Sequence, residues 1–181
     1  MNPRALSADT HPFLFLDRDG VINVRLVDDY VKSWNEFQFI AGTPSAIARF
    51  SKVFRRVFIV TNQRGIARGL MTSADLDAIH GRMLEAIRET GGRIDAIYHC
   101  PHDRETGCDC RKPRIGLAHH AKEQYPEIEF SQSIMVGDSD SDMRFAEAAG
   151  MARVFVGTAP PARTTADLIV PSLSAFADTL G

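Results

Sequence analysis

The stretch Phe13–Gly20, FLFLDRDG, decides the fold class, because four apolar residues in a row end abruptly in two aspartates. A short apolar run of this length is typical of a buried strand. Asp17 and Asp19 follow it at a spacing of two, which places their side chains on the same side of the chain. Two carboxylates this close repel one another, and one takes up a proton unless a cation lies between them. The stretch therefore predicts a buried strand that delivers two acids to one site.

Further apolar runs alternate with helical patterns along the chain. Strands are expected at residues 13–16, 57–60, 94–98, 133–136, 153–156 and 168–170. Helices are expected at residues 74–90, with Thr72 or Ser73 as the cap, at 117–124 and at 140–149. This alternation predicts a parallel sheet with helices on both faces, a three-layer α/β/α Rossmann-like fold. Ligands of such sheets bind beyond the carboxyl ends of the strands, so the residues after each strand are the site candidates.

Length and composition indicate a single globular domain over residues 1–181. The net charge is −2, so no broad basic field points to a nucleic-acid or membrane partner. The apolar run at 13–16 is too short for a signal peptide or a membrane span. An odd number of cysteines argues against a closed disulfide framework. We therefore expect a cytoplasmic protein, and a monomer because no apolar helix stripe is left over for a partner.

A second acidic cluster follows the strand expected at 133–136, where Asp138, Asp140 and Asp142 come after a glycine. Mg²⁺ takes oxygen ligands and usually binds substrate phosphate as well, so the two acidic clusters together predict a magnesium site. Asp138 stands at the strand end and is the expected ligand of this cluster. Asp140 is either a further acid of the site or the cap of the next helix. Asp142 can orient a nearby lysine.

Neutral donors and one cation follow the other strands. Thr61 ends the run at 57–60, and its hydroxyl and the backbone amides of Asn62 and Gln63 are suited to phosphoryl oxygens. Lys112 precedes the helix at 117–124 and can neutralise charge that develops on a transferring phosphoryl group. Each residue taken alone has an ordinary alternative, a β-branched strand residue or a solvated lysine.

Four motifs, DRDG, VTNQ, Lys112 and GDSDSD, stand in the order found in the haloacid dehalogenase superfamily of phosphatases, which the chain resembles. The resemblance implies that Asp17 is the nucleophile, forming an aspartyl-phosphate, and that Asp19 is the general acid and then the base. It implies that Thr61 and Lys112 bind the phosphoryl group. Mg²⁺ would be held by Asp17, the backbone carbonyl of Asp19, and Asp138.

The three cysteines lie with a histidine inside eleven residues of the stretch 98–113, YHCPHDRETGCDCRKP. The candidate ligands are Cys100, His102, Cys108 and Cys110. Three thiolates and one imidazole form closed tetrahedral Zn²⁺ sites, which leave no open position for catalysis. We therefore expect a structural zinc ion that fixes a loop over residues 99–112. Free thiols are the alternative, and a cysteine nucleophile is disfavoured because Asp17 already fills that role.

This loop, with LDRDGVIN, TNQRGIARG and MVGD, narrows the resemblance to the D-glycero-D-manno-heptose 1,7-bisphosphate 7-phosphatases, over residues 13–157. That family implies a sugar bisphosphate substrate hydrolysed at C7, in activated heptose synthesis for lipopolysaccharide, S-layer or capsule. It implies a compact form without a large cap domain. A flap-like segment at 21–42 and the zinc loop would then shape the pocket, with Arg111 contacting the substrate.

Two positions depart from the family pattern. Ser139 stands where many members carry a lysine, and Arg64 replaces the serine that is common in TNQSG. We hypothesise that Arg64, or Arg68 nearby, supplies cationic charge near the bound sugar phosphate. Solvated arginines are the alternative.

Two other functions fit part of the pattern. Histidinol-phosphate phosphatases share the fold, the four motifs and a similar zinc loop, but take a monophosphate with a cationic tail. Acidic residues at the pocket rim, such as Asp28 and Asp29, favour that substrate. Arginines in the pocket favour a second phosphate instead, and the candidates are Arg64, Arg68 and Arg111. A catalytically silent, zinc-bound binding protein is the remaining alternative, although it has no chemical need of two paired aspartates.

Overall fold

The computed structural model describes residues 6–160, 162 and 164–180. Within them, six strands form a single sheet in the order β3-β2-β1-β4-β5-β6, and every neighbouring pair is parallel. Their bounds are Phe13–Leu16 (β1), Arg56–Asn62 (β2), Ala96–Cys100 (β3), Ser133–Gly137 (β4), Ala152–Val156 (β5) and Leu168–Val170 (β6). The order reverses between β1 and β4. In open parallel sheets the ligand crevice lies at this point, beyond the carboxyl ends of the strands.

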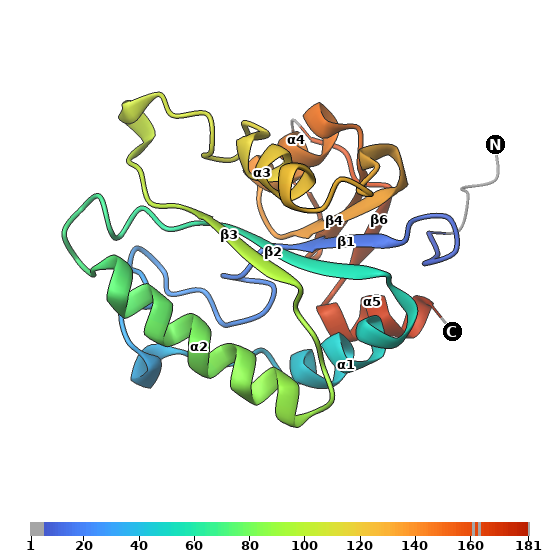
Figure 1. Ribbon diagram of the computed structural model, residues 1–181, viewed down its shortest axis with the longest axis horizontal. Helices are drawn as coiled ribbons and strands as arrows, with labels where there is room; N and C mark the ends of the chain where they lie inside the picture. Colours follow the sequence, from blue (N-terminus) through green and yellow to red (C-terminus); the bar gives the residue numbers. More distant parts are fainter. Residues whose placement is uncertain (1–5, 161, 163, 181) are drawn as a thin grey trace.

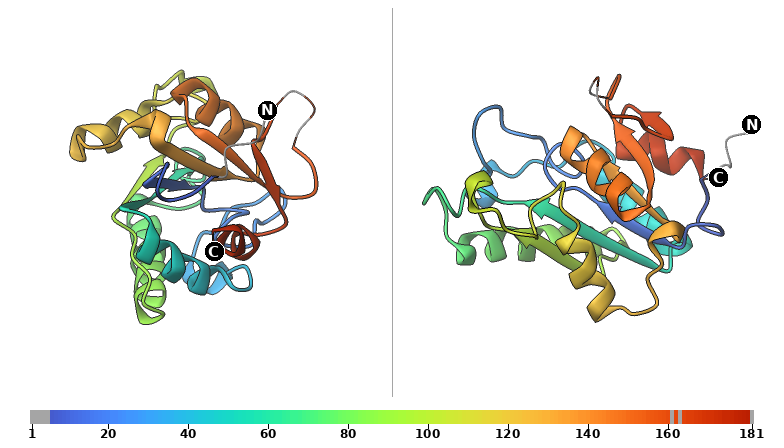
Figure 2. Two further views of the ribbon diagram at one scale, coloured as in Figure 1. Left: turned by 90° about the vertical axis from the view of Figure 1, so that its right-hand side faces the viewer. Right: turned by 90° about the horizontal axis from the view of Figure 1, so that it is seen from above.

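Helices cover both faces of the sheet, so the protein has three layers (Figure 1). Figure 2 shows the same layers from two further sides. One face carries α1 (Thr43–Val53), α2 (Ser73–Glu89) and α5 (Leu173–Thr179), and the other carries α3 (Gly116–Gln124) and α4 (Asp140–Ala149). Short 3-10 helices are η1 (Trp34–Glu36), η2 (Arg104–Thr106) and η3 (Phe130–Gln132). The predicted three-layer fold is confirmed, and the part of the chain that the structure describes holds no large cap domain.

The central strand β1 is fixed by a core on each face. Leu14 and Leu16 belong to the core that includes Phe50 of α1, whereas Phe13 and Phe15 pack on the side of α3 and α4. Alternate residues of a strand point to opposite faces, which divides the four residues between the two cores. Complete burial of such a side chain contributes about 1.5–3 kcal/mol. The end of β1, where the first acidic pair begins, is therefore held rigidly in the middle of the sheet.

The six predicted strands are confirmed, with some ends shifted by a few residues. β2 continues through Thr61 and Asn62, because these residues pair in register with the last two residues of β3. β3 begins at Ala96 rather than at residue 94, and it takes in His99 and Cys100 from the predicted loop. The sequence pattern did not predict α1 and α5. Their signals were local and short, a proline in the first turn of α1 and a capping serine, Ser172, before α5.

Helix caps agree with the sequence pattern at α2 but not at α4. Thr72 caps α2 and forms a reciprocal pair of hydrogen bonds with Asp75. At α4, the cap is Ser139 and not Asp140, which already has helical backbone. The Ser139 hydroxyl accepts from the Asp142 N–H at 3.4 Å, and the Ser139 N–H donates to Asp142 Oδ2 at 3.1 Å. The alternative that Asp140 caps this helix is therefore wrong.

Two segments stand at the carboxyl edge of the sheet, residues 21–42 and the loop that follows β3 (Figure 1). The first is tied to the core at its base, because Val21 and Ile22 are fully buried and Asn23 bridges to Phe39. That residues 21–42 act as a flap stays a prediction. None of the helices in the described ranges has the length and hydrophobicity needed to span a bilayer.

Candidate active site

Asp17 is the first residue after β1, and its side chain is buried at the crevice between β1 and β4. Its N–H donates to the carbonyl of Val136 at 2.9 Å. This hydrogen bond continues the pairing of β1 with β4 and fixes the backbone of Asp17. Oδ1 accepts from Lys112 Nζ at 2.9 Å, and Oδ2 lies 3.8 Å from Arg25. Burial and the charge of Asp142 raise the pKa of Asp17 to about 6, although Lys112 opposes the shift. The carboxylate is thus poised between two cations.

Lys112 is buried, and all three of its ammonium N–H groups are hydrogen bonded. They donate to Asp17 Oδ1 at 2.9 Å, to the carbonyl of Val60 at 2.7 Å and to Asp142 Oδ1 at 2.6 Å. Burial lowers the pKa of Lys112, but the charges of Asp142 and Asp17 outweigh burial, so the pKa lies above its usual value. Asp142 therefore orients a lysine, as the sequence suggested, and Lys112 remains a cation beside Asp17.

Asp19 accepts four hydrogen bonds. Arg18 Nη2 donates to both carboxylate oxygens, Asn23 Nδ2 donates to Oδ1 and Gln63 Nε2 donates to Oδ2, each at 2.9 Å. Burial disfavours the charged form, but the charge of Arg18 and these hydrogen bonds outweigh it and lower the pKa of Asp19. Arg18 is itself fully buried, with Nη1 lying 3.3 Å from Nε2 of His80. The protein therefore holds Asp19 as a carboxylate.

Three oxygens, one each from Asp17, Asp19 and Asp138, converge on one nitrogen of Arg25. Arg25 Nη2 donates to Asp138 Oδ1 at 2.7 Å and to the backbone carbonyl of Asp19 at 3.0 Å, and it lies 3.8 Å from Asp17 Oδ2. Burial and the charge of Asp17 raise the pKa of Asp138 to about 7, with Arg25 opposing. Carboxylate and carbonyl oxygens that gather around one positive charge are the donor set that Mg²⁺ prefers. These residues fit the magnesium ion that the motifs predict.

Gly20 makes room for Asp138. Its φ is +91°, a conformation that glycine adopts readily, and a Cβ there would lie 1.9 Å from Oδ2 of Asp138. Asp142 also belongs to the carboxylate cluster, but its oxygens accept from Lys112 and Ser139. Asp138 is therefore the better candidate to share a metal ion with Asp17.

The predicted phosphoryl donors are held by hydrogen bonds within the protein. The Thr61 hydroxyl accepts from Gln63 Nε2 at 2.9 Å, and the Gln63 N–H donates to the carbonyl of Cys100 at 2.7 Å. Asn62 forms a reciprocal pair with the backbone of Lys112, in which Nδ2 donates at 3.1 Å and Oδ1 accepts at 3.0 Å. The side chains of Asn62 and Gln63 therefore position Lys112 and Asp19. That the Thr61 hydroxyl and the backbone amides of Asn62 and Gln63 bind phosphoryl oxygens stays a prediction, and the Gln63 amide donates to Cys100 instead in this structure.

A cavity of about 580 Å³ opens over these groups, and Asp17, Asp19, Thr61 and Lys112 line it. Five arginines also line the cavity, namely Arg25, Arg64, Arg68, Arg104 and Arg111. Arg64 Nη2 lies 2.8 Å from Asp103 Oδ1. Arg111 Nη1 donates to the carbonyl of His102 at 3.3 Å. The cavity therefore joins the acidic pair to a wall of five arginines, of which Arg25 and Arg64 are paired with acids.

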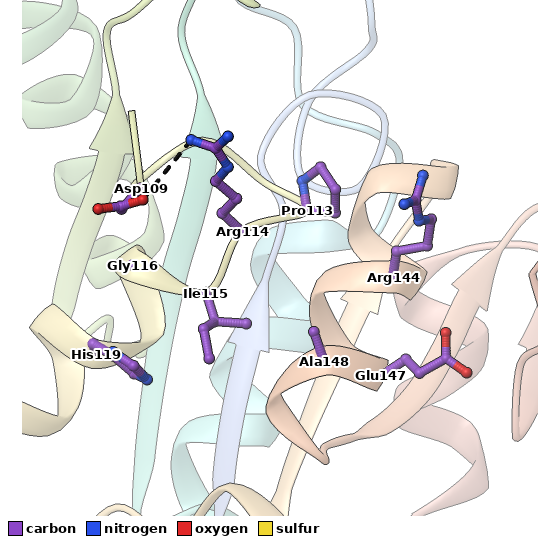
Figure 3. A pocket seen from close by; sticks show the side chains of 9 residues that line it. All are labelled: Asp109, Pro113, Arg114, Ile115, Gly116, His119, Arg144, Glu147 and Ala148. Carbon is purple, nitrogen blue, oxygen red and sulfur yellow. Dashed lines mark ion pairs between the residues drawn. The ribbon is translucent and has the colours of Figure 1, made fainter. Parts of the chain in front are cut away.

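A second cavity, of about 700 Å³, lies between α3 and α4 (Figure 3). Its two arginines are paired with acids, since Arg114 lies 3.8 Å from Asp109 and Arg144 lies 3.5 Å from Asp140. None of the three converging oxygens belongs to its described lining. We therefore place the active site at the smaller cavity.

The cysteine loop brings its four predicted ligands together. Cys100 Sγ lies 3.6 Å from Cys108 Sγ and 3.7 Å from His102 Nδ1, which lies 3.2 Å from Cys110 Sγ. All four ligand atoms lie within 4.8 Å of one another. Zn–S bonds near 2.3 Å give a tetrahedron with edges of about 3.8 Å, whereas a disulfide needs an S–S distance of about 2.05 Å. The spacing therefore suits a tetrahedral zinc ion, and the three cysteines form no disulfide.

Comparison with known proteins agrees with this geometry. Residues 109–179 match the family described as HAD-hydrolase-like. Over 173 residues the chain is 41% identical to D-glycero-beta-D-manno-heptose-1,7-bisphosphate 7-phosphatase from Pseudomonas aeruginosa, spanning 92% of this chain and 96% of the relative. The chain belongs to the D-glycero-D-manno-heptose-1,7-bisphosphate 7-phosphatase family. The resemblance predicted from the motifs is thereby confirmed.

Other members of the heptose-bisphosphate phosphatase family show similar agreement. The D-glycero-alpha-D-manno-heptose-1,7-bisphosphate 7-phosphatase of Mycobacterium tuberculosis is 39% identical, spanning 93% of this chain and 90% of the relative. The crystal structure of D,D-heptose 1,7-bisphosphate phosphatase from B. bronchiseptica, complexed with magnesium and phosphate, superimposes with a TM-score of 0.82 at 37% identity. That comparison covers 92% of this chain and 96% of the other. Sequence and fold therefore place the chain in one family.

Several residues of this phosphatase site were not predicted from the sequence. Arg18 and Asn23 hold Asp19, Arg25 contacts the converging oxygens, and Arg104 lines the cavity. Arg18 carried a signal, because it lies inside the DRDG motif between the two acids. Asn23 and Arg25 lie in the segment after β1, and Arg104 begins the short 3-10 helix η2, so neither periodicity nor a strand end indicates the direction of their side chains.

Proposed function

We propose that the protein is a magnesium-dependent phosphatase that removes the C7 phosphate of D-glycero-D-manno-heptose 1,7-bisphosphate. The observation that carries the proposal is the convergence of Asp17, Asp138 and the carbonyl of Asp19 on one positive charge beside buried Lys112. The names of the relatives support the substrate. The magnesium and phosphate in the B. bronchiseptica structure support the cofactor and the reaction class.

In the first step, Asp17 attacks the phosphorus of the C7 phosphate. A bond forms between the carboxylate and phosphorus, and the bond from phosphorus to the C7 oxygen breaks. Lys112, held beside Asp17 by Asp142 and the carbonyl of Val60, stabilises the charge on the phosphoryl oxygens. Bound magnesium supplies further neutralisation and aligns the phosphoryl group. Asp19, after taking a proton from water and turning from Arg18, gives this proton to the departing C7 oxygen and becomes a carboxylate again.

In the second step, water attacks phosphorus and releases inorganic phosphate from Asp17. Asp19 takes the proton of this water, which requires its carboxylate form. The hydrogen bonds from Arg18, Asn23 and Gln63 maintain that form. Proton transfer by a positioned side chain typically contributes about 10²–10⁴-fold to the rate. A covalent intermediate divides one difficult displacement into two easier steps.

The wall of the cavity favours a substrate with two phosphates over histidinol phosphate. Five arginines line it, and three of them, Arg68, Arg104 and Arg111, form no ion pair with a described residue, so they offer partners for a second phosphate. Of the acids at the rim, Asp29 lies 2.6 Å from Lys32 Nζ, which neutralises part of the charge that would attract a cationic tail. Asp28 is the other rim acid. The balance of charge therefore supports a sugar bisphosphate.

The proposal includes a structural zinc ion held by the cysteine loop. Cys110 directly precedes Arg111 and Lys112, so a zinc ion would fix the backbone from which both cations leave. Arg114 Nη1 donates to the carbonyl of Cys108 at 2.7 Å, which ties the next residues to the same loop. The ion would hold in place a loop in which hydrophobic packing is sparse.

A side-by-side comparison of kcat/KM with Mg²⁺ tests the proposal, using the α and β anomers of the heptose bisphosphate and histidinol phosphate. The comparison needs both anomers, because the relative named for the β anomer is 41% identical to this chain and the relative named for the α anomer is 39% identical. We expect one heptose anomer to be the best substrate. A preference for histidinol phosphate of tenfold or more, equivalent to about 1.4 kcal/mol in transition-state binding, would contradict the proposed heptose substrate. Phosphate release that persists in Asp17→Asn would overturn the mechanism.

A further inference from the structure

One guanidinium nitrogen of Arg25 lies next to the oxygens of the candidate metal site. Nη2 lies 2.7 Å from Asp138 Oδ1, 3.0 Å from the carbonyl oxygen of Asp19 and 3.8 Å from Asp17 Oδ2. These three oxygens are the same ones that the proposed function assigns to magnesium. Arg25 therefore donates to two of the three oxygens and brings its positive charge near the third.

A magnesium ion and this guanidinium group exclude one another. Mg²⁺ binds its oxygen ligands at about 2.0–2.1 Å. A nitrogen within 3.0 Å of two of those oxygens would then lie in contact with the ion. Arginine keeps its proton, so it cannot avoid the repulsion by becoming neutral. Magnesium binding therefore requires the side chain of Arg25 to move.

The surroundings of Arg25 permit that movement. Its side chain is 48% exposed, whereas that of Arg18, which serves the adjacent Asp19, is 1% exposed. Arg25 lies in an irregular segment whose neighbour Val27 is 87% exposed. Few packing contacts resist its displacement, so one cation can replace another at modest cost.

The displaced guanidinium stays in the same cavity as the substrate. Arg25 lines that cavity together with Arg64, Arg68 and Arg111. A phosphate group of the substrate offers the bidentate oxygen partners that a guanidinium prefers. A phosphate group of the substrate bound in this cavity can thus replace the carboxylate partner that Arg25 loses.

We propose that Arg25 exchanges partners during the catalytic cycle, serving as counter-ion of the metal-binding oxygens until magnesium displaces it and then as a ligand of the anionic substrate. This inference rests on the proposed function, because it requires magnesium at these oxygens. It predicts opposite effects of one substitution on two ligands. Loss of Arg25 strengthens magnesium binding and weakens substrate binding.

Calorimetric titration of the full chain with MgCl₂ tests the first half. We expect Arg25→Gln to bind Mg²⁺ about three- to tenfold more tightly than the wild type, since a half-exposed ion pair no longer competes. Arg68→Gln is the matched control, because it removes the same charge from the same cavity without a contact to the metal oxygens. Equal affinity in wild type and Arg25→Gln, or an equal gain in both variants, would overturn the competition.

Thermal unfolding provides a readout that does not depend on turnover. Without added Mg²⁺, Arg25→Gln is expected to melt below the wild type, because the carboxylates lose their counter-ion. Saturating Mg²⁺ should narrow this gap, since the ion then replaces Arg25 in both proteins. A gap that is equally large with and without Mg²⁺ would indicate a purely structural role and contradict the exchange.

Steady-state kinetics at saturating Mg²⁺ tests the second half. Arg25→Gln is expected to raise KM for the heptose bisphosphate by at least threefold, and unchanged KM would overturn the role as substrate ligand. The titration separates this inference from the proposed function. Wild-type protein that binds no Mg²⁺ would refute both, whereas wild type that binds Mg²⁺ with the affinity of Arg25→Gln would refute the inference alone.

Discussion

Lys112 and Asp142 form a buried ion pair, with Nζ 2.6 Å from Oδ1 and side chains 1% and 0% exposed. Asp17 lies on the other side of the same ammonium group at 2.9 Å. Removal of one member of a buried pair leaves a charge without its partner, which is strongly destabilising. The stability of the fold and the position of the candidate nucleophile therefore depend on the same contact.

Substitution of Asp142 is expected to affect both properties. Asp142→Asn keeps the shape but removes the charge, so we expect the free energy of unfolding to fall by about 3 kcal/mol. The displaced lysine should lower kcat by on the order of 10²-fold. Asp140→Asn is the control, because its side chain is 42% exposed and pairs only at 3.5 Å with Arg144. Denaturant unfolding and steady-state kinetics measure both effects. Equal effects of the two substitutions would contradict the role of Asp142 in holding Lys112.

Stability is expected to depend on pH through the metal-site carboxylates. Burial raises the pKa of Asp138 to about 7 and that of Asp17 to about 6, both above the ordinary value of 3.8. Between pH 3.8 and about 7, the folded chain therefore binds more protons than the unfolded chain. This contribution to stability is present at low pH and is lost as the pH rises to about 7. Magnesium binds the deprotonated carboxylates, so it should raise Tm more at about pH 8 than at about pH 5.5. Melting curves with and without added Mg²⁺ at each pH measure the difference, and a magnesium effect independent of pH would contradict it.

Zinc removal is expected to loosen the loop that carries Arg111 and Lys112. Purified protein should contain about one zinc ion per chain, with four ligands in a closed site. His102→Ala should lose most of this zinc, lower Tm and reduce kcat/KM, because the loop between β3 and Lys112 is no longer fixed. His120→Ala is the matched control, since His120 is exposed on α3. Metal analysis that finds the wild-type zinc content in His102→Ala would refute the site.

Gly20 is expected to be required for magnesium affinity. Gly20→Ala would place a Cβ 1.9 Å from Asp138 Oδ2, in addition to the cost of about 1–2 kcal/mol for a left-handed backbone. Gly69→Ala is the control, because Gly69 has φ +67° and a Cβ added there would meet no atom of the described residues within 4 Å. Both variants should lose stability, but only Gly20→Ala should weaken magnesium binding in a calorimetric titration. Equal magnesium affinity in the two variants would rule out the steric role.

Local patterns were sufficient for the architecture and for several site residues. The run before Asp17 predicted a buried strand because a parallel sheet with two covered faces requires continuous apolar residues. The spacing of Cys100, His102, Cys108 and Cys110 predicted a four-ligand cluster, since all four lie in one short loop. The structure brings these atoms together within 4.8 Å. In both cases the pattern that carries the prediction lies within one short stretch of sequence.

The sequence by itself determined the parallel α/β fold, the acids at the strand ends and the zinc-type loop. Tertiary structure alone decided which side chains complete the site. Arg25 and Asp138 are 113 residues apart, yet they are in contact, and no local pattern indicated that Arg25 belongs to the site. Strand order and register decide whether such distant residues meet, whereas apolar periodicity reports only which face of one element is buried. The physical reason is that side-chain contacts between segments depend on packing, which no single segment encodes.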